Sequence, residues 1–422
     1  MPSARHAGFL QSPRTEHPLV VQHDRGKEPM NRLIAAILAV GLAPAALAQE
    51  AAAPASAPAE SSEIDTAALK GQVDALAEQL AEMKTDVSGL KKLKFSGYVQ
   101  PRFGWLEAAQ YEKGAPQRDG FYVRRGRFKA VYDSDLAQYV IQLDATPSGV
   151  GLKEAYASFK LPFLKGFAID AGLQLMPFGY DVGVRSSSDL DLLERAMFAG
   201  HFLKGEYDLG VALRGAYGPV NFKVGVFNGN GVDGASGKDN DQRKDVIGRL
   251  GVDLGMITGG VSGWYGKTID YTSATNATYD RVRLGADLQL YLDLLPVGGT
   301  ALKGEYVWGK TAIGTGAGGA GDSLGLIGYG WDVILTQNVG PWNQVAVRYD
   351  TFNPNVKLDR NLAANQGKVF ITDEVSAALH TILSSNLKLS VAYYHPMNRE
   401  KGDTAPSDPK KDSFVAQLQA KF

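Results

Sequence analysis

The chain has 422 residues, a formal net charge of -1 and no cysteine. The lack of cysteine excludes disulfides, thiol catalysis and thiolate metal sites, and the near-zero charge gives no support to nucleic-acid binding. No linker interrupts the sequence after about residue 95, which favours one large closed sheet over several domains.

Residues 30–48 predict a secretory signal peptide. Arg32 supplies a basic start, residues 33–47 are apolar, and Ala46-Leu47-Ala48 is a small-x-small cleavage site. The apolar stretch is too short for a membrane anchor, and no other stretch predicts a transmembrane helix. The mature protein is therefore expected to be exported, and any crossing of a membrane must use strands.

Residues 1–29 are polar and contain four prolines, unlike the basic start of a signal peptide. We interpret them as a mis-annotated extension of a chain that begins at Met30. A genuine extended leader is the alternative.

Two further segments precede the strands. Residues 49–63 are rich in Ala, Pro and Ser and predict a flexible linker. Residues 64–92 predict a coiled coil, because apolar residues alternate spacings of four and three. The heptad positions are Val73, Leu80 and Val87 at a and Leu69, Leu76, Met83 and Leu90 at d. The pattern predicts an oligomer without deciding between dimer and trimer; an amphipathic helix packed on its own chain is the alternative.

From residue 95 onward, short alternating segments predict about sixteen strands separated by turn signals. They lie near 95–107, 120–133, 137–146, 151–161, 166–175, 208–217, 219–228, 243–254, 259–268, 280–292, 298–310, 324–337, 342–352, 367–383, 386–396 and 411–422. The predicted connections alternate between long and short. Transmembrane barrels of the outer membrane show this asymmetry, whereas a soluble sandwich has no reason for it.

The segment Phe121–Asp133 shows the side-chain pattern most clearly. Read at a period of two, one face carries Phe121, Val123, Arg125, Arg127, Lys129 and Val131, and the other carries Tyr122, Arg124, Gly126, Phe128, Ala130 and Tyr132. A membrane barrel would turn the aromatic face to lipid and line a wet lumen with the cations. A soluble binding protein, with the aromatic face in a dry core, is the competing interpretation.

Later strands repeat this layout. Val282, Leu284, Ala286, Leu288, Leu290 and Leu292 predict a lipid-facing row, and Arg281, Arg283 and Asp287 alternate with them. Burying such ions in a dry core costs several kcal/mol each, roughly, and a wet lumen removes that cost. The last strand ends on Phe422, which resembles the terminal aromatic by which the outer-membrane assembly machinery recognises its clients.

The order of several motifs resembles the phosphate-selective porin O and P family. The motifs are residues 95–103 (FSGYVQPRF), Arg124-Arg125, residues 154–159 (EAYASF) and residues 172–179 (GLQLMPFG). The resemblance implies an all-β fold, a 16-stranded antiparallel barrel over residues 95–422. It also implies a homotrimer in the bacterial outer membrane that passes phosphate or polyphosphate. The even number of predicted strands returns both ends of the barrel to the periplasm, where we expect the coiled coil.

Strand parity predicts a basic lumen. The candidate pore-lining, anion-binding residues are Arg125, Arg127, Lys129, Arg214, Lys223, Arg249, Arg281, Arg283, Lys303 and Arg348. Inward carboxylates are interleaved with them, so a non-selective general porin competes with an anion-selective one. By analogy with general porins, residues 176–207 form a constriction loop with Arg185, Ser186, Ser187, Ser188, Arg195 and Lys204; its Leu190, Leu192 and Leu193 predict a short helix against the wall. The alternative is an exposed surface loop.

The sequence gives little support to a metal site, a nucleotide-binding loop or a catalytic site. No histidine spacing indicates a metal site, no glycine-rich segment is followed by the Lys-Ser/Thr of a phosphate-cradling loop, and no triad of Ser, His and an acid stands out. We therefore expect no enzyme, cofactor or metal. The partners expected are outer-membrane lipid, further copies of the chain, small anionic solutes and the assembly machinery. A structural tether that uses the coiled coil, and a sugar-specific porin, are the remaining alternatives.

Overall fold

The computed structural model describes residues 70–71, 74–80, 91–107, 119–203, 206–229, 231, 239, 242–270, 277–311, 326–359, 361–405 and 407–422. Sixteen antiparallel strands in this part of the chain form one closed barrel, as predicted. They are β1 (Leu93–Leu106), β2 (Gly120–Asp133), β3 (Ala137–Thr146), β4 (Gly149–Lys160), β5 (Phe167–Leu175), β6 (Tyr207–Tyr217), β7 (Val220–Phe227), β8 (Asp245–Asp253), β9 (Ile257–Asp270), β10 (Ala277–Leu295), β11 (Gly298–Thr311), β12 (Leu326–Val339), β13 (Asn343–Asn353), β14 (Val369–Ser384), β15 (Leu387–Lys401) and β16 (Ser413–Lys421). Two short helical segments lie in connections, α3 (Met197–Phe202) and the 3-10 turn η2 (Ala363–Asn365).

The predicted signal peptide and linker lie outside the described residues. So does most of the predicted coiled coil, of which residues 70–71 and 74–80 are described and helical. Its association with other copies stays a prediction. No described helix combines the length and the apolar composition that a membrane crossing requires.

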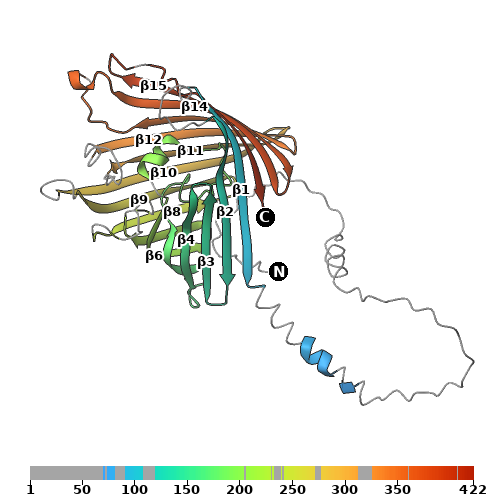
Figure 1. Ribbon diagram of the computed structural model, residues 1–422. Coiled ribbons are helices and arrows are strands. Elements are labelled where there is room, and N and C mark those ends of the chain that lie inside the picture. The colour runs from blue at the N-terminus through green and yellow to red at the C-terminus, as the bar shows by residue number, and fades with distance from the viewer. Residues whose placement is uncertain are drawn as a thin grey trace, which may run out of the picture. The chain divides into compact units, whose positions relative to one another are not determined.

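The first and last strands close the barrel. β1 pairs with β16 in antiparallel register, and Figure 1 shows β1 beside the C-terminal strands. Phe422 extends this pairing, because its backbone N–H and C=O each bond to Gly97 at 3.0 Å. A Cβ on Gly97 would lie 2.3 Å from the carbonyl oxygen of Arg127 and 2.5 Å from the Phe422 ring, so glycine is required at this junction.

Deletion of Phe422 should lower the yield of closed barrel. The change removes two backbone hydrogen bonds at the junction, each worth about 1 kcal/mol net, together with the terminal aromatic proposed as the assembly signal. The measurement is the fraction of protein with the fast electrophoretic mobility of the folded barrel in unheated detergent. Phe163→Ala, an exposed aromatic outside the strands, is the control. Equal folded fractions for the deletion and the control would contradict the prediction.

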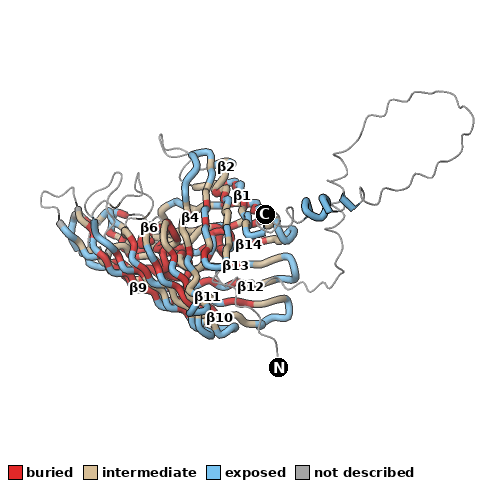
Figure 2. The backbone as a smooth tube through the Cα atoms, turned by 90° about the horizontal axis from the view of Figure 1, so that it is seen from below, coloured by how far each residue is buried: buried red, intermediate tan, exposed pale blue. Residues whose placement is uncertain are grey.

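The polarity of the barrel is the reverse of that of a soluble protein. In β10, Leu284 and Leu288 are 56% and 51% exposed, whereas Arg283 and Gln289 are 4% and 1% exposed. Figure 2 shows the same alternation of buried and exposed residues along the other strands. Apolar side chains outside and polar side chains inside require a lipid environment, because water would not stabilise such an outer surface.

The predicted asymmetry of the connections holds with one exception. The long connections 176–206 and 402–412 lie at one end of the barrel, and tight turns such as Gly218-Pro219 lie at the other. The exception is Pro147-Ser148, a two-residue connection between β3 and β4 at the end that carries the long loops.

Candidate functional site

The connection between β5 and β6, residues 176–206, is called here the inner loop. Near its start, Gly179 donates its backbone N–H to the hydroxyl of Ser262 on β9 at 2.9 Å. Further along, the hydroxyl of Ser187 lies 2.7 Å from that of Tyr98 on β1. Because β1 and β9 stand on opposite sides of the closed barrel, one loop can contact both only from within. The inner loop therefore lies inside the barrel.

Side chains of the wall hold the inner loop by its backbone. Glu305 on β11 accepts hydrogen bonds from the N–H groups of Tyr180 and Asp181 at 3.1 and 2.8 Å. The Tyr394 hydroxyl on β15 accepts from the N–H groups of Leu193 and Glu194, both at 3.0 Å. Further bonds of this kind join His380 to Asp191, Arg348 to Glu194, Asp350 to Met197, Gln100 to Ser187 and Gln419 to Ser188. These bonds satisfy backbone groups that a buried loop would otherwise leave unpaired, and they fix its path.

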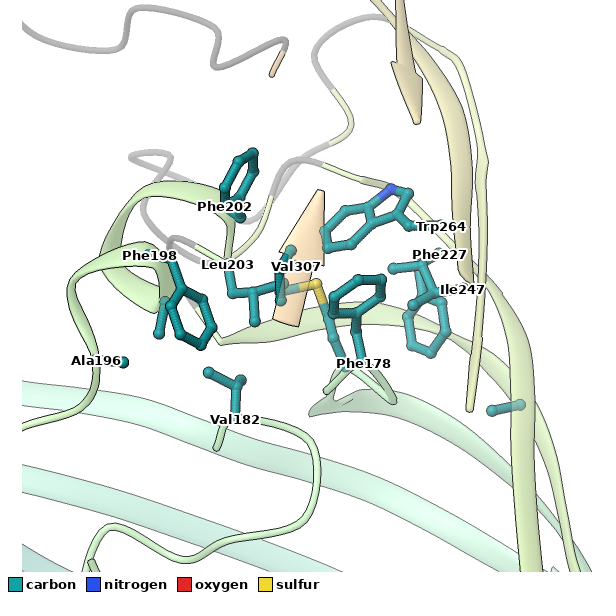
Figure 3. Packing of buried hydrophobic residues seen from close by; sticks show 13 residues of the cluster. Phe178, Val182, Ala196, Phe198, Phe202, Leu203, Phe227, Ile247, Trp264 and Val307 are labelled. Atoms are coloured by element: carbon teal, nitrogen blue, oxygen red, sulfur yellow. The ribbon is translucent and has the colours of Figure 1, made fainter. Parts of the chain in front are cut away.

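An apolar cluster holds the first and last parts of the inner loop. Figure 3 shows Phe178, Val182, Phe198, Phe202 and Leu203 of the loop packed with wall residues, which are Phe227, Ile247, Trp264 and Val307. The short helix α3 contributes Phe198 and Phe202 and contacts β11, β12 and β13. The wall is apolar where the loop covers it, so this contact resembles a small protein core inside the barrel.

The helix in the inner loop is not where the leucines predicted it. Residues 190–194 form no helix; α3 begins at Met197. Leu192 and Leu193 instead pack in a second cluster on the wall, with Ile334, Ala346, Ala378, Ala392, Tyr394 and Val415. Bonds from the wall to this stretch, such as that from His380 to the carbonyl of Asp191, compete with helical hydrogen bonds, which explains the difference.

Most of the ten predicted lumen cations are paired with carboxylates. Eight have a carboxylate oxygen within 4.0 Å: Arg127 with Asp144, Lys129 with Glu154, Arg214 and Lys223 with Asp170, Arg249 with Asp287, Arg281 with Asp245, Lys303 with Asp191, and Arg348 with Glu374 and Asp350. The predicted basic lumen is thus largely neutralised by its interleaved acids, since each pair places opposite charges a few ångströms apart.

Arg125 and Arg283 have no such carboxylate partner among the described residues. The guanidinium of Arg283 lies 3.9 Å from the centre of the Trp264 ring, which stabilises its charge by a cation–π contact. Arg125 is 5% exposed and donates a long bond of 3.4 Å to the amide oxygen of Gln100. Arg125 and Arg283 are therefore the two predicted lumen cations without a carboxylate within 4.0 Å in the described residues.

A β-bulge changes the predicted parity of β2. Gln100 on β1 pairs with Arg125, but the next residue, Pro101, pairs with Val123, so that Arg124 has no partner in the register. Arg124 is directed inward, where it binds Glu194 of the inner loop. Its predicted place on the lipid-facing side is wrong, because Pro101 cannot donate to the strand ladder and an extra residue is accommodated there.

The same bulge reverses the residues before it. Phe121 and Val123 were predicted on the cationic face, yet Phe121 is 90% exposed and its ring lies 5.2 Å from that of the outward Phe103. The proline inside a predicted strand, followed by an Arg-Arg pair on the next one, is the sequence signal by which this bulge could be recognised.

A second bulge adds another cation to the interior. On β4 the register passes from Glu154 to Leu152, leaving Lys153 unpaired. Its amine lies 5.8 Å from the centre of the Tyr207 ring, over which Arg127 also lies at 6.0 Å. Lys153 was not predicted as a lumen residue, because strict alternation places it opposite Glu154.

Arg102 is a third inward cation that the prediction omitted. It is 2% exposed, and it shares the Glu194 carboxylate with Arg124. Its position on β1, two residues after the inward Gln100, follows from the same alternation and could have been derived from it.

These residues form one feature, called here the basic cluster: Arg102, Arg124, Arg125, Arg127 and Lys153. Two carboxylates lie within ion-pair distance of it in the described part of the chain, Glu194 and Asp144. Counted within ion-pair distance, five cations against two acids leave an excess of three positive charges. Arginine presents its N–H donors as a planar fork that matches carboxylates and phosphates, so the cluster can bind oxyanions.

Glu194 is the carboxylate that the inner loop places in the basic cluster. Arg124 donates to both of its oxygens, at 2.9 and 3.1 Å, and Arg102 donates to one of them at 2.5 Å. Burial by itself would raise the pKa of Glu194, but the hydrogen bonds and charge of Arg124 and the charge of Arg102 outweigh it and lower the pKa to about 2. Glu194 is therefore ionised at neutral pH, and its side chain remains 38% exposed.

Carboxylates gather on a different part of the wall. Glu305 on β11, Asp332 on β12 and Asp350 on β13 lie on neighbouring strands and point inward. Arg348 lies beside them, 2.9 Å from Glu374 and 3.9 Å from Asp350. The basic cluster on β1, β2 and β4 and these carboxyl groups on β11 to β13 therefore lie on opposite sides of the closed sheet.

The other predicted loop residues hold the inner loop together. Arg185 pairs with Asp181 and Asp191, and Arg195 pairs with Asp181 and Glu206. Ser186 is exposed and bonds to Ser188, whereas Ser187 and Ser188 are buried. Lys204 lies outside the described residues.

The family model for phosphate-selective porin O and P matches residues 93–254. This match confirms the resemblance inferred from the motifs, over the part of the chain that holds β1 to β8. Among curated proteins, no significant match to this chain exists.

Solved structures share the fold at low sequence identity. The trimer form of OmpT, an outer-membrane protein of Vibrio cholerae, is 11% identical with a TM-score of 0.54, covering 78% of this chain and 99% of its own. An anion-selective porin from Comamonas acidovorans is 14% identical with a TM-score of 0.53, covering 78% and 99%. The outer-membrane channel DcaP of Acinetobacter baumannii is 11% identical with a TM-score of 0.53, covering 78% and 97%. These barrels share the closed β-barrel fold of this chain, and the family match covers its first eight strands.

Proposed function

We propose that this chain is an outer-membrane porin through which small hydrophilic solutes diffuse passively, with anions favoured. The observation that carries the proposal is the inner loop, which is suspended in a sixteen-stranded barrel beside a basic cluster with an excess of three positive charges. A barrel of this size leaves room for an aqueous channel. The inner loop narrows that channel, and the basic cluster attracts anions at the narrowing.

Phosphate is the anion that this chemistry favours, on two grounds. Arg102, Arg124 and Arg125 present guanidinium groups close together, and such groups bind phosphate oxygens through paired N–H donors. The matching family model is described as phosphate-selective. Because eight of the ten predicted cations are paired with acids, we expect a modest preference rather than exclusion of cations.

A general porin without charge preference is the second candidate. The pairing of most lumen cations favours it, since a paired cation contributes little net field along the channel. Both candidates place the protein in the outer membrane with its apolar outer surface in lipid. We further propose a homotrimer, supported by the trimer form of the similar OmpT barrel, with the N-terminal coiled coil in the periplasm.

Replacing Arg125 with Gln should weaken the anion preference. Arg125 has no carboxylate within ion-pair distance in the described chain, so its removal subtracts a charge without leaving an acid unpaired. The permeability ratio of chloride to potassium should fall roughly two- to threefold. It is measured as the zero-current potential of the purified protein in a planar bilayer under a KCl gradient, with added phosphate as a blocker of the current.

The matched control is Lys267→Gln on the outer side of β9. Lys267 is about half exposed and lies 3.8 Å from Asp280, so the control changes the same formal charge away from the lumen. A wild-type protein with large conductance, no anion preference and no block by phosphate would favour the general porin. A protein that inserts but never conducts would overturn the channel proposal and leave a tether as the remaining function.

A further inference from the structure

We propose that the Glu194 carboxylate acts as a tethered anion and thereby limits the channel's preference for anions. It occupies the oxyanion-binding site formed by Arg102 and Arg124 of the basic cluster, called here the seat. The inference rests on the proposed porin function and identifies the residue that sets its specificity. Glu194 is a specificity-determining residue in this view, and the entering solute competes with it for the guanidinium groups of Arg102 and Arg124.

The geometry around Glu194 is that of a bound oxyanion. Arg124 donates from Nε to Oε1 at 2.9 Å and from a terminal nitrogen to Oε2 at 3.1 Å. This two-point contact is the way in which a guanidinium recognises a carboxylate or phosphate. Arg102 binds Oε1 from the neighbouring strand β1 at 2.5 Å. The seat is thus built and filled by a group of the chain itself.

Access to the seat is open. The side chains of Arg124 and Glu194 are each 38% exposed, whereas the side chain of Arg102 is 1% exposed. Arg102 therefore forms the inner wall of the seat, and Arg124 and Glu194 form its solvent side. An anion that arrives from the lumen meets Arg124 first, and it can replace the Glu194 carboxylate without displacing a buried side chain.

The backbone at Glu194 is held independently of its carboxylate. The N–H of Glu194 donates to the Tyr394 hydroxyl at 3.0 Å, its carbonyl accepts from Arg348 at 3.0 Å, and the preceding carbonyl of Leu193 accepts from Arg102 at 2.7 Å. Neutral glutamine has nearly the same shape as glutamate. Glu194→Gln should therefore leave the inner loop in place while it removes the tethered charge.

The test compares the Glu194→Gln variant with wild type in planar bilayers, using phosphate as the probe. Removal of one negative charge from the seat should raise the chloride-to-potassium permeability ratio by roughly threefold. The phosphate concentration that halves the chloride current should fall by a similar factor. Single-channel conductance in symmetric KCl should change much less, because the loop keeps its position.

Two controls separate charge from position. Asp189→Asn removes the same charge from the same loop, but Asp189 pairs with Lys421 on β16 at 2.6 Å and is not in contact with the basic cluster. This variant should leave phosphate block unchanged. The double variant Glu194→Gln/Arg124→Gln restores the net charge of the cluster and removes half of the seat, so its phosphate block should be no stronger than that of wild type.

The outcomes distinguish this inference from the proposed function. If wild type conducts and Glu194→Gln leaves both the permeability ratio and the phosphate block unchanged, the tethered-anion role is overturned and the porin function stands. If Asp189→Asn strengthens phosphate block as much as Glu194→Gln does, the effect belongs to the overall charge of the loop, and the seat is overturned. If wild type does not conduct at all, the porin function itself fails.

Discussion

Excision of the inner loop should raise the single-channel conductance several-fold. The variant replaces residues 177–205 with a short Asn-Gly turn between β5 and β6. The design suits the structure because Leu175 pairs with Tyr207, and the N–H of Met176 donates to the carbonyl of Glu206 at 3.0 Å. The two strands are therefore already adjacent where the loop leaves the wall, and a two-residue turn can join them as a hairpin.

The reason for the increase is that the inner loop crosses the barrel interior from β9 to β1 and narrows the channel there. Its removal leaves only the wall, and the remaining lumen is wider and wetter. Charge selectivity should fall at the same time, because the narrowing that holds ions close to the basic cluster is lost, and this loss should outweigh the gain from removing the Glu194 carboxylate. The measurements are conductance in symmetric KCl and the zero-current potential in a gradient.

Folding must be verified first, because the excision also exposes inward apolar residues such as Trp264 and Val307. The electrophoretic mobility in unheated detergent reports whether the barrel is closed. A closed barrel whose conductance equals that of wild type would show that the inner loop does not limit ion flow. That result would remove the basis for placing selectivity at this loop.

Gly330→Leu should displace α3 and destabilise the barrel by about 2 kcal/mol, the usual cost of overpacking a filled site. Gly330 lies on β12 with its α-carbon facing the inner loop. A Cβ there would lie 2.3 Å from the Cβ and 3.0 Å from the Cγ of Phe198. These atoms cannot overlap, so α3 must move away from the wall. The Phe198 ring then leaves the cluster that it forms with Phe202 and Val307.

Gly263→Leu is the matched control for this variant. Gly263 lies on β9 between the inward residues Ser262 and Trp264, so it faces outward, and a Cβ there would meet nothing within 4 Å. Thermal denaturation in detergent and single-channel noise are the two measurements. The Gly330 variant should unfold at lower temperature and show fluctuating conductance, whereas the control should match wild type. Equal behaviour of the two variants would mean that α3 does not need its contact with β12.

The sequence by itself determined the barrel and its polarity. Apolar and polar side chains alternate strictly in a segment such as residues 281–289. The apolar ones can face lipid while the polar ones face water only if the strand spans a membrane as part of a closed sheet. The structure confirms sixteen strands in the described residues, with Leu284 outside and Arg283 inside. This information is local, because each side chain's face follows from its own position along the strand.

Only the tertiary structure decided which inward cations are paired with carboxylates and which are left to attract anions. Periodicity placed Arg127, Lys129 and several carboxylates inside, but it did not show which of them form pairs. Asp144 comes from β3, next to β2, and Glu154 comes from β4, two strands away. Cross-strand pairing depends on register, and register is set by turns and bulges across the whole sheet.

Two bulges show where side-chain direction cannot be predicted from strand alternation alone. A single extra residue at Arg124, and another at Lys153, turned each side chain inward against the alternation. The seat around Glu194 could not be predicted at all, because it joins Arg102 on β1, Arg124 on β2 and a loop about seventy residues further along the chain. Arg102, Arg124 and Glu194 come together only in the closed barrel, because there the inner loop crosses the lumen and reaches β1 and β2.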